Sequence, residues 1–195
     1  MFYKECIQGL RGNEFLLNKE TRFVYKQLVK LQATPLIFRI KRGYKMFISD
    51  YTETFTNLHK IKISPKAKEI TFRLIYNITP TYRAQQMSKC KLCKKNVKET
   101  EDHLFYQCKV VTPVIEILKE IIEMYASNDV DMYKVITLNM IPKVPRDVEH
   151  KILILLAEFR RLVWCCRIKC VFEQRIYTPE MFALIFDRCT SYVFE

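Results

Sequence analysis

The sequence predicts a mostly α-helical protein: an irregular helical domain with a small zinc knuckle inserted between helices. Three observations lead to this prediction. The 195 residues are 49% hydrophobic but include only 3 Gly, too few for glycine-rich phosphate loops or a turn-rich sandwich. Apolar residues recur at helical spacing along most of the chain. Between the helical stretches, Cys and His residues stand at the spacing of metal ligands.

The first half of the chain contains three predicted helices, over 20–32, 51–60 and 65–77. The third has the clearest start, because Ser64 can cap it and Pro65 has no N–H to leave unpaired at the first helical position. A basic connector, 39–45, separates the first two helices. The connector is predicted to be a short strand or an irregular loop. Its basic side chains either face solvent or form part of a phosphate-binding surface.

The second half contains a helix over 113–126, a long helix over 146–176 and a last helix from Pro179 to the carboxyl end. The sequences Thr112-Pro113 and Thr178-Pro179 repeat the start signal seen at Ser64. The first of these helices has one apolar stripe, formed by Val114, Ile117, Leu118, Ile121, Ile122 and Tyr125. The long helix is apolar on nearly every side, which predicts that several neighbours bury it.

The chain therefore divides into a basic helical region (1–81), a zinc knuckle (82–110) and a helical region (111–195), with the two helical regions packed as one unit.

One group of residues predicts a metal site: Cys90, Cys93, His103 and Cys108 form the pattern C-x2-C-x9-H-x4-C. Two cysteines three positions apart fit one turn around an ion, and thiolate and imidazole ligands prefer zinc. Four protein ligands leave no position for a water, so we predict one structural Zn2+.

Two other interpretations of the cysteines stay open: a redox pair at Cys90 and Cys93, or plain buried thiols. A redox pair normally opens a helix after a strand, and no such pattern is visible. Cys165, Cys166 and Cys170 are predicted to be buried core thiols, although Cys166 and Cys170 have metal-ligand spacing on one helix face. The acidic run 99–102 is predicted to be the amino end of a helix. No catalytic residue or motif is found, so we predict that the chain is not an enzyme.

The net charge of +12 is unevenly distributed. Residues 1–98 contain 21 basic and 6 acidic side chains, and residues 99–195 contain 12 basic and 15 acidic ones. Such asymmetry favours RNA or DNA as a partner, although a solvated basic face is the alternative. If six phosphates are neutralised, log K falls with log salt at a slope of about −5. The predicted contacts are Lys89, Lys91, Lys94, Lys95 and Lys98 of the knuckle and Arg39, Lys41, Arg42 and Lys45 of the connector.

No membrane segment is expected, because the longest apolar run is Ile152 to Ala157 and a spanning helix needs about 20 residues. The amino end MFYKECIQGLRG lacks the apolar core of a secretory signal. We therefore expect a nuclear or cytoplasmic protein that is not secreted.

The segment ISPKAKEITFRLIYNITPTYRAQQMSKCKLCKKNVKETEDHLFYQC at 63–108 resembles the zinc-binding region that follows the polymerase in non-LTR (LINE-type) retrotransposon reverse transcriptases. The shared features are the Asn-x-x-Pro-Thr turn, the Cys-x-Leu-Cys pair, Glu-Thr ahead of the histidine and His-Leu-Phe-x-x-Cys. The later AEFRRLVWCCR, with Trp164 and Arg167, is similar to the family's helix after the knuckle. The chain departs from the family at Phe55, where tryptophan is frequent.

The resemblance implies a zinc-stapled accessory domain that helps a polymerase-containing partner chain hold RNA or DNA. It assigns the four ligands and no other residue. The chain starts at Met1 and contains neither polymerase aspartates nor an endonuclease, so we expect that it does not copy RNA by itself. A domesticated remnant, a fragment and a relic all fit the resemblance. The alternative function is a structural zinc domain that mediates protein–protein interaction without binding nucleic acid.

Overall fold

The computed structural model describes residues 58, 61–75, 79, 89–127 and 129–193. The chain divides into two compact units, Met1–Ile40 and Lys41–Glu195, and all described residues belong to the second. The predicted helices over 20–32 and 51–60, apart from position 58, and the connector 39–45 lie outside the described residues. The boundary at 40/41 falls inside the predicted 1–81 region, and the division into three regions stays a prediction.

The described residues are mostly helical and contain no β-strand, which confirms the predicted fold class. The elements, in chain order, are α4 (Pro65–Ile75), the π-helical turn η2 (His103–Gln107), α5 (Thr112–Glu123), α6 (Met132–Leu138), α7 (Arg146–Phe172), α8 (Pro179–Thr190) and the 3-10 turn η3 (Ser191–Val193). No helix in this part of the chain is both long enough and apolar enough to span a bilayer.

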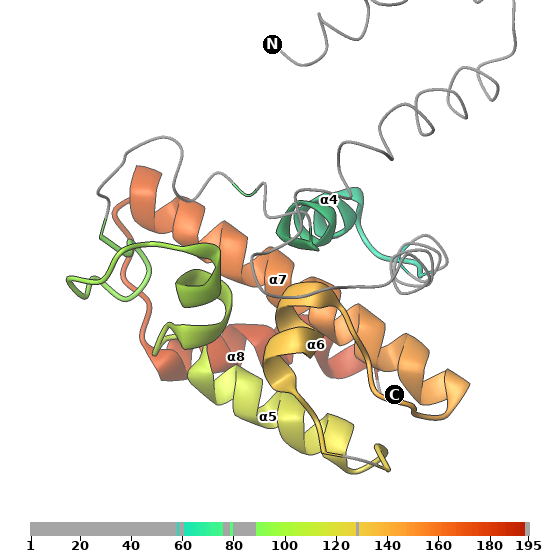
Figure 1. The fold of residues 1–195 in the computed structure, drawn as a ribbon. Coiled ribbons are helices and arrows are strands. Elements are labelled where there is room, and N and C mark those ends of the chain that lie inside the picture. The colour runs from blue at the N-terminus through green and yellow to red at the C-terminus, as the bar shows by residue number, and fades with distance from the viewer. Residues whose placement is uncertain (1–57, 59–60, 76–78, 80–88, 128, 194–195) are drawn as a thin grey trace, which may run out of the picture. The chain divides into compact units, whose positions relative to one another are not determined.

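The long helix α7 is the centre of this unit (Figure 1), with α4, α5, α6 and α8 around it. Its buried side chains point in several directions, as the sequence predicts. Phe159 is 0% exposed and packs edge-to-face on Phe182 and Phe186 of α8, with ring centroids 6.2 and 6.3 Å away. The helix ends at Phe172 rather than near 176, because Gln174 adopts a left-handed conformation with φ 53°.

The short helix α6 is not predicted by the sequence analysis. Asp131 caps it by accepting a hydrogen bond from the N–H of Lys134 at 3.1 Å, and Asn139 ends it with φ 59°. The buried guanidinium of Arg160 donates to the carbonyls of Ile136 and Val135, both at 2.9 Å, and to Asn139 Oδ1 at 2.8 Å. Arg160 therefore joins the carboxyl end of α6 to α7.

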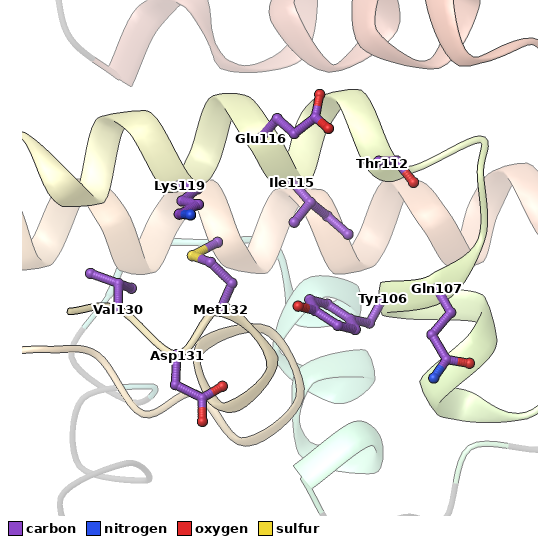
Figure 2. A pocket seen from close by; sticks show the side chains of 9 residues that line it. All are labelled: Tyr106, Gln107, Thr112, Ile115, Glu116, Lys119, Val130, Asp131 and Met132. Carbon is purple, nitrogen blue, oxygen red and sulfur yellow. The ribbon is translucent and has the colours of Figure 1, made fainter.

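A pocket of about 480 Å³ lies between η2, α5 and the start of α6 (Figure 2). Tyr106, Ile115 and Met132 supply much of its apolar wall. Two of its charged groups already have partners: Lys119 pairs with Glu123 at 3.5 Å, and Asp131 pairs with Lys134 at 3.1 Å. We assign no ligand to this pocket.

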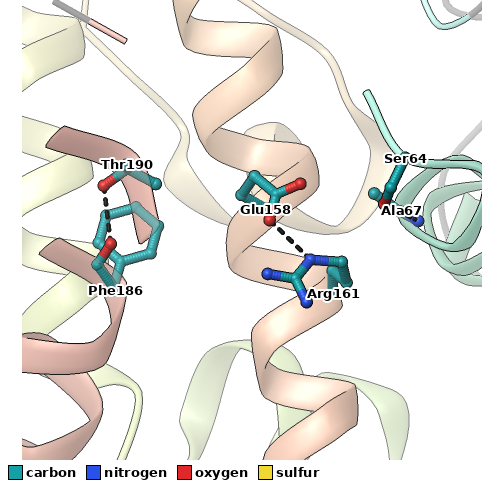
Figure 3. A network of polar contacts seen from close by, with 6 residues as sticks. All are labelled: Ser64, Ala67, Glu158, Arg161, Phe186 and Thr190. Carbon is teal, nitrogen blue, oxygen red and sulfur yellow. Dashed lines mark hydrogen bonds and ion pairs between the residues drawn. The ribbon is translucent and has the colours of Figure 1, made fainter. Parts of the chain in front are cut away.

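Two of the three predicted helix starts are confirmed in detail. The Ser64 hydroxyl accepts from the N–H of Ala67 at 3.2 Å (Figure 3). The Thr178 hydroxyl accepts from the N–H of Met181, also at 3.2 Å. The start at Thr112 is different: α5 begins there, but the Thr112 hydroxyl donates to the Cys108 carbonyl at 3.3 Å. The chain enters α5 directly from the turn after Cys108, so the hydroxyl points back to that turn.

The apolar stripe predicted for the helix at 113–126 is partly wrong. Val114, Leu118 and Ile122 are buried as expected, but Ile117 and Tyr125 are 41% and 42% exposed. The buried face is instead widened by Ile115, which is 8% exposed. The neighbouring elements, which the sequence pattern does not locate, decide which flank of the stripe is covered.

Candidate metal centre

The first two predicted ligands lie on a short hairpin, residues 89–98, called here the metal-site hairpin. Lys89 and Lys98 pair across it as an antiparallel bridge, and the N–H of Cys90 donates to the Val97 carbonyl at 2.8 Å. The N–H of Lys94 returns to the Cys90 carbonyl at 3.1 Å, and Lys94 is left-handed with φ 54°. This tight turn brings the Cys90 and Cys93 thiols to one side of the hairpin.

The other two ligands stand at the two ends of the turn η2. Thr100 starts it: its hydroxyl accepts from the N–H of His103 at 3.0 Å, and its carbonyl accepts from the N–H of Leu104 at 2.9 Å. The chain then becomes extended at Cys108, with φ −71° and ψ 122°. Leu104 and Phe105 are 0% exposed, so the same turn that carries the ligands also packs into the core.

The four residues form one buried group. Their ligand atoms all lie within 4.8 Å of one another, and the Cys93 Sγ is 3.4 Å from the His103 Nε2. Sulfur ligands about 2.3 Å from a tetrahedral ion are about 3.8 Å apart, so a small inward movement closes the group around an ion. The cluster can therefore hold a metal ion, and its donor set is compatible with zinc.

Hydrogen bonds and burial shift the pKa values of the three thiols in different directions. A hydrogen bond with the Cys108 thiol lowers the pKa of the Cys90 thiol to about 5. The same hydrogen bond, together with burial, raises the pKa of the Cys108 thiol, and burial raises the pKa of the Cys93 thiol. Thiols bind a metal as thiolates, so protons compete with a divalent cation for these cysteines and binding would weaken as the pH falls.

The structure reveals an anchor that the sequence analysis missed. The carboxylate of Glu99, whose side chain is 0% exposed, accepts from the N–H of Lys91 at 3.0 Å. Its other oxygen accepts two hydrogen bonds from Arg167 of α7, at 2.8 and 2.9 Å. The Arg167 guanidinium also lies over the Trp164 ring, 5.0 Å from its centroid. Glu99 thus fixes the peptide between the first two ligands to the central helix.

The neighbouring acidic residues are further anchors. Glu101 Oε1 accepts from the N–H of Thr79 at 2.8 Å, and Asp102 Oδ1 accepts from the hydroxyl of Tyr133 at 2.9 Å. A helical turn begins at 101, as predicted. Glu99 and Glu101 are buried and hydrogen-bonded, so their role is more than a favourable interaction with the helix dipole. These partners lie 22 to 68 positions away along the chain, so no local pattern could identify them.

The predicted nucleic-acid contacts form two groups, and the structure describes only the lysines of the metal-site hairpin. Every lysine of the metal-site hairpin is exposed, while Cys90, Leu92 and Cys93 between them are buried. The exposed lysines are Lys89, Lys91, Lys94, Lys95 and Lys98. Arg39, Lys41, Arg42 and Lys45 lie outside the described residues.

Two of the three thiols of α7, Cys166 and Cys170, are buried as predicted, at 3% and 9% exposed, and burial raises the pKa of the Cys166 thiol to about 11. The third, Cys165, is half-buried, which the sequence analysis did not predict. Within the described ranges, the four-residue group is the only cluster of three or more His, Cys, Asp or Glu residues positioned to hold an ion.

Comparison with family models, curated proteins and solved structures finds no match to this chain.

Proposed function

We propose that the protein is a non-catalytic, zinc-binding accessory domain that binds RNA or DNA through its basic surface. Zinc is the ion favoured by three thiolates and one imidazole, and four protein ligands leave no position for a reacting water. The resemblance to the region after the polymerase of LINE-type reverse transcriptases points in the same direction. It suggests that the domain works together with a polymerase.

The observation that carries this proposal is the arrangement of the metal-site hairpin. Five exposed lysines stand on a ten-residue hairpin that also carries two of the four candidate ligands, Cys90 and Cys93. A bound metal would hold these lysines at fixed separations, which reduces the entropy lost when they contact phosphates. Lysine contacts of this kind are salt-dependent and weakly specific for sequence.

Metal content and nucleic-acid binding can be measured on one purified sample. Mass spectrometry should give one zinc per chain. Fluorescence anisotropy with labelled single-stranded RNA and duplex DNA, at several salt concentrations, should give log K against log salt with a slope between about −3 and −5 for five lysine contacts. A flat salt dependence, or no binding at low salt, would contradict the proposal.

A matched pair of variants localises the contacts. Replacing Lys94 and Lys95 by Gln should weaken binding and make the slope about 2 less steep, because each phosphate contact contributes about 1. Replacing Lys119 and Lys143, two exposed lysines outside the hairpin, removes the same charge. That control variant should keep the parent slope, and equal effects in both variants would show that only total charge matters.

A second candidate function is protein–protein interaction through a structural zinc domain. The observation that favours it is the exposure of large apolar side chains on and beside α5 and α8: Met124 is 70% exposed, Leu184 52% and Met181 47%. This candidate predicts that a partner protein stays bound after nuclease treatment, and that the purified chain gives no gel shift at physiological salt.

A further inference from the structure

The carboxyl end of α7 presents an unusual aromatic side chain. Phe172, the last residue of the helix, is 78% exposed, and Ile176 just beyond it is 63% exposed. The turn between them is held by the Lys169 carbonyl, which accepts from the N–H groups of Glu173 at 2.9 Å and Arg175 at 3.3 Å. Phe172 therefore projects from a defined helix end.

This helix end lies beside the metal-site hairpin. Arg167 contacts Glu99, directly after the hairpin, at 2.8 Å, and Phe172 follows five residues later, about 7.5 Å along the helix axis. Cys170, two residues before Phe172, belongs to the same buried cluster as Cys90, Leu92 and Cys93 of the hairpin. The exposed aromatic ring thus stands at the end of the helix against which the lysine-bearing hairpin packs.

The cations near Phe172 indicate what it contacts. Lys169 precedes it by one helical turn and is exposed, and Lys94 and Lys95 stand on the nearby hairpin. A surface that combines cations with an exposed aromatic ring suits a chain of phosphates with accessible bases. In a duplex the bases are stacked on one another and their faces are covered, so only a single strand offers them to a ring.

We propose that Phe172 stacks on a base of single-stranded RNA or DNA whose phosphates contact the hairpin lysines. The inference rests on the proposed function and narrows it to single-stranded nucleic acid. Phe172 supplies the contact to the base, and the lysines supply the contacts to the backbone.

The test compares Phe172→Ala, Phe172→Trp and the parent chain, each loaded with zinc. The probes are a labelled single-stranded oligonucleotide and the duplex formed with its complement. Phe172→Ala should weaken single-strand binding about 5- to 150-fold, the range expected for one lost base stack, without changing the salt slope. Phe172→Trp should keep the affinity, and the added indole should lose fluorescence when the single strand binds. Tyr192→Ala is the control, since Tyr192 is also exposed, at 58%.

The outcomes separate this inference from the proposed function. If Phe172→Ala binds the single strand as tightly as the parent, or if the parent prefers the duplex, base stacking is wrong while nucleic-acid binding stands. If Phe172→Ala changes self-association in sedimentation and leaves nucleic-acid affinity unchanged, the ring belongs to a protein contact and the inference is overturned. If the parent binds neither probe, both proposals fail.

Discussion

Arg160 is a fully buried cation whose hydrogen bonds go to neutral oxygens. Burial lowers its pKa to about 9, which still leaves the guanidinium charged at neutral pH. Its three acceptors are at the carboxyl end of α6, where aligned peptide dipoles leave partial negative charge. The charge of Arg160 therefore stabilises the end of a helix that is too short to be stable alone.

We expect Arg160→Met to lower the free energy of unfolding by about 3 kcal/mol or more. The replacement fills similar volume but leaves buried carbonyl oxygens without donors, and each such group costs about 1–3 kcal/mol. Urea unfolding followed by circular dichroism measures the change. The control is Arg73→Met, which removes an exposed ion pair with Glu69 and should cost less than about 1 kcal/mol. Similar losses in the two variants would contradict the role given to Arg160.

The contrast between the ligands and Arg160 shows what single residues reveal in a sequence. Cys90, Cys93, His103 and Cys108 are brought together within 19 positions by local turns, so their spacing was sufficient to predict the cluster. Arg160 stands next to Arg161, and their order in the sequence does not show which one is inside. Arg160 is buried because α6 packs over it, whereas Arg161 pairs with Glu158 at 2.6 Å near the surface.

At the scale of elements, helix starts were predicted well and short elements were not. The capping hydroxyls of Ser64 and Thr178 act within three residues, so the sequence contains all the information needed. The seven residues of α6 contain too few turns for a periodic pattern. Its Asp131 cap was the one available signal. The exposed flank of α5 could not be predicted because it depends on elements that are distant in the sequence.

The ion pair between Glu99 and Arg167 links the segment that follows the hairpin to α7, and we expect its loss to weaken zinc binding. Glu99→Gln should weaken zinc binding by about 10- to 100-fold, the usual effect of losing a group that orients ligands. The amide removes the charge that holds Arg167 and loosens the peptide at Lys91. Competition with a chromogenic chelator measures the affinity.

A matched variant separates positioning from general destabilisation. Glu69→Gln breaks the exposed pair with Arg73 and should leave zinc affinity unchanged. If Glu99→Gln retains the parent affinity for zinc while its melting temperature falls, Glu99 stabilises the fold without positioning the ligands, and the prediction is wrong.

At the scale of the whole described unit, the metal centre and the helices share one core. Leu92 and Leu104 of the ligand segments belong to the same buried cluster as Val114 of α5, Phe159 of α7 and Phe182 of α8. The candidate metal site is therefore not a separate module on the surface. A change in the ligands reaches the helices through direct packing, so the loss of the metal should affect more than residues 82–110.

Removing the metal is expected to unfold this unit. Structural zinc sites contribute an apparent ~10–16 kcal/mol, comparable with the whole stability of most domains, about 5–15 kcal/mol. Cys93→Ser, or chelation of the parent chain, should therefore abolish the cooperative thermal transition and reduce the helical circular dichroism. Cys189→Ser changes a half-buried thiol on α8 outside the cluster and should melt close to the parent. A Cys93→Ser chain that kept the parent's helicity and melting temperature would show that the cysteine–histidine group does not hold a stabilising ion.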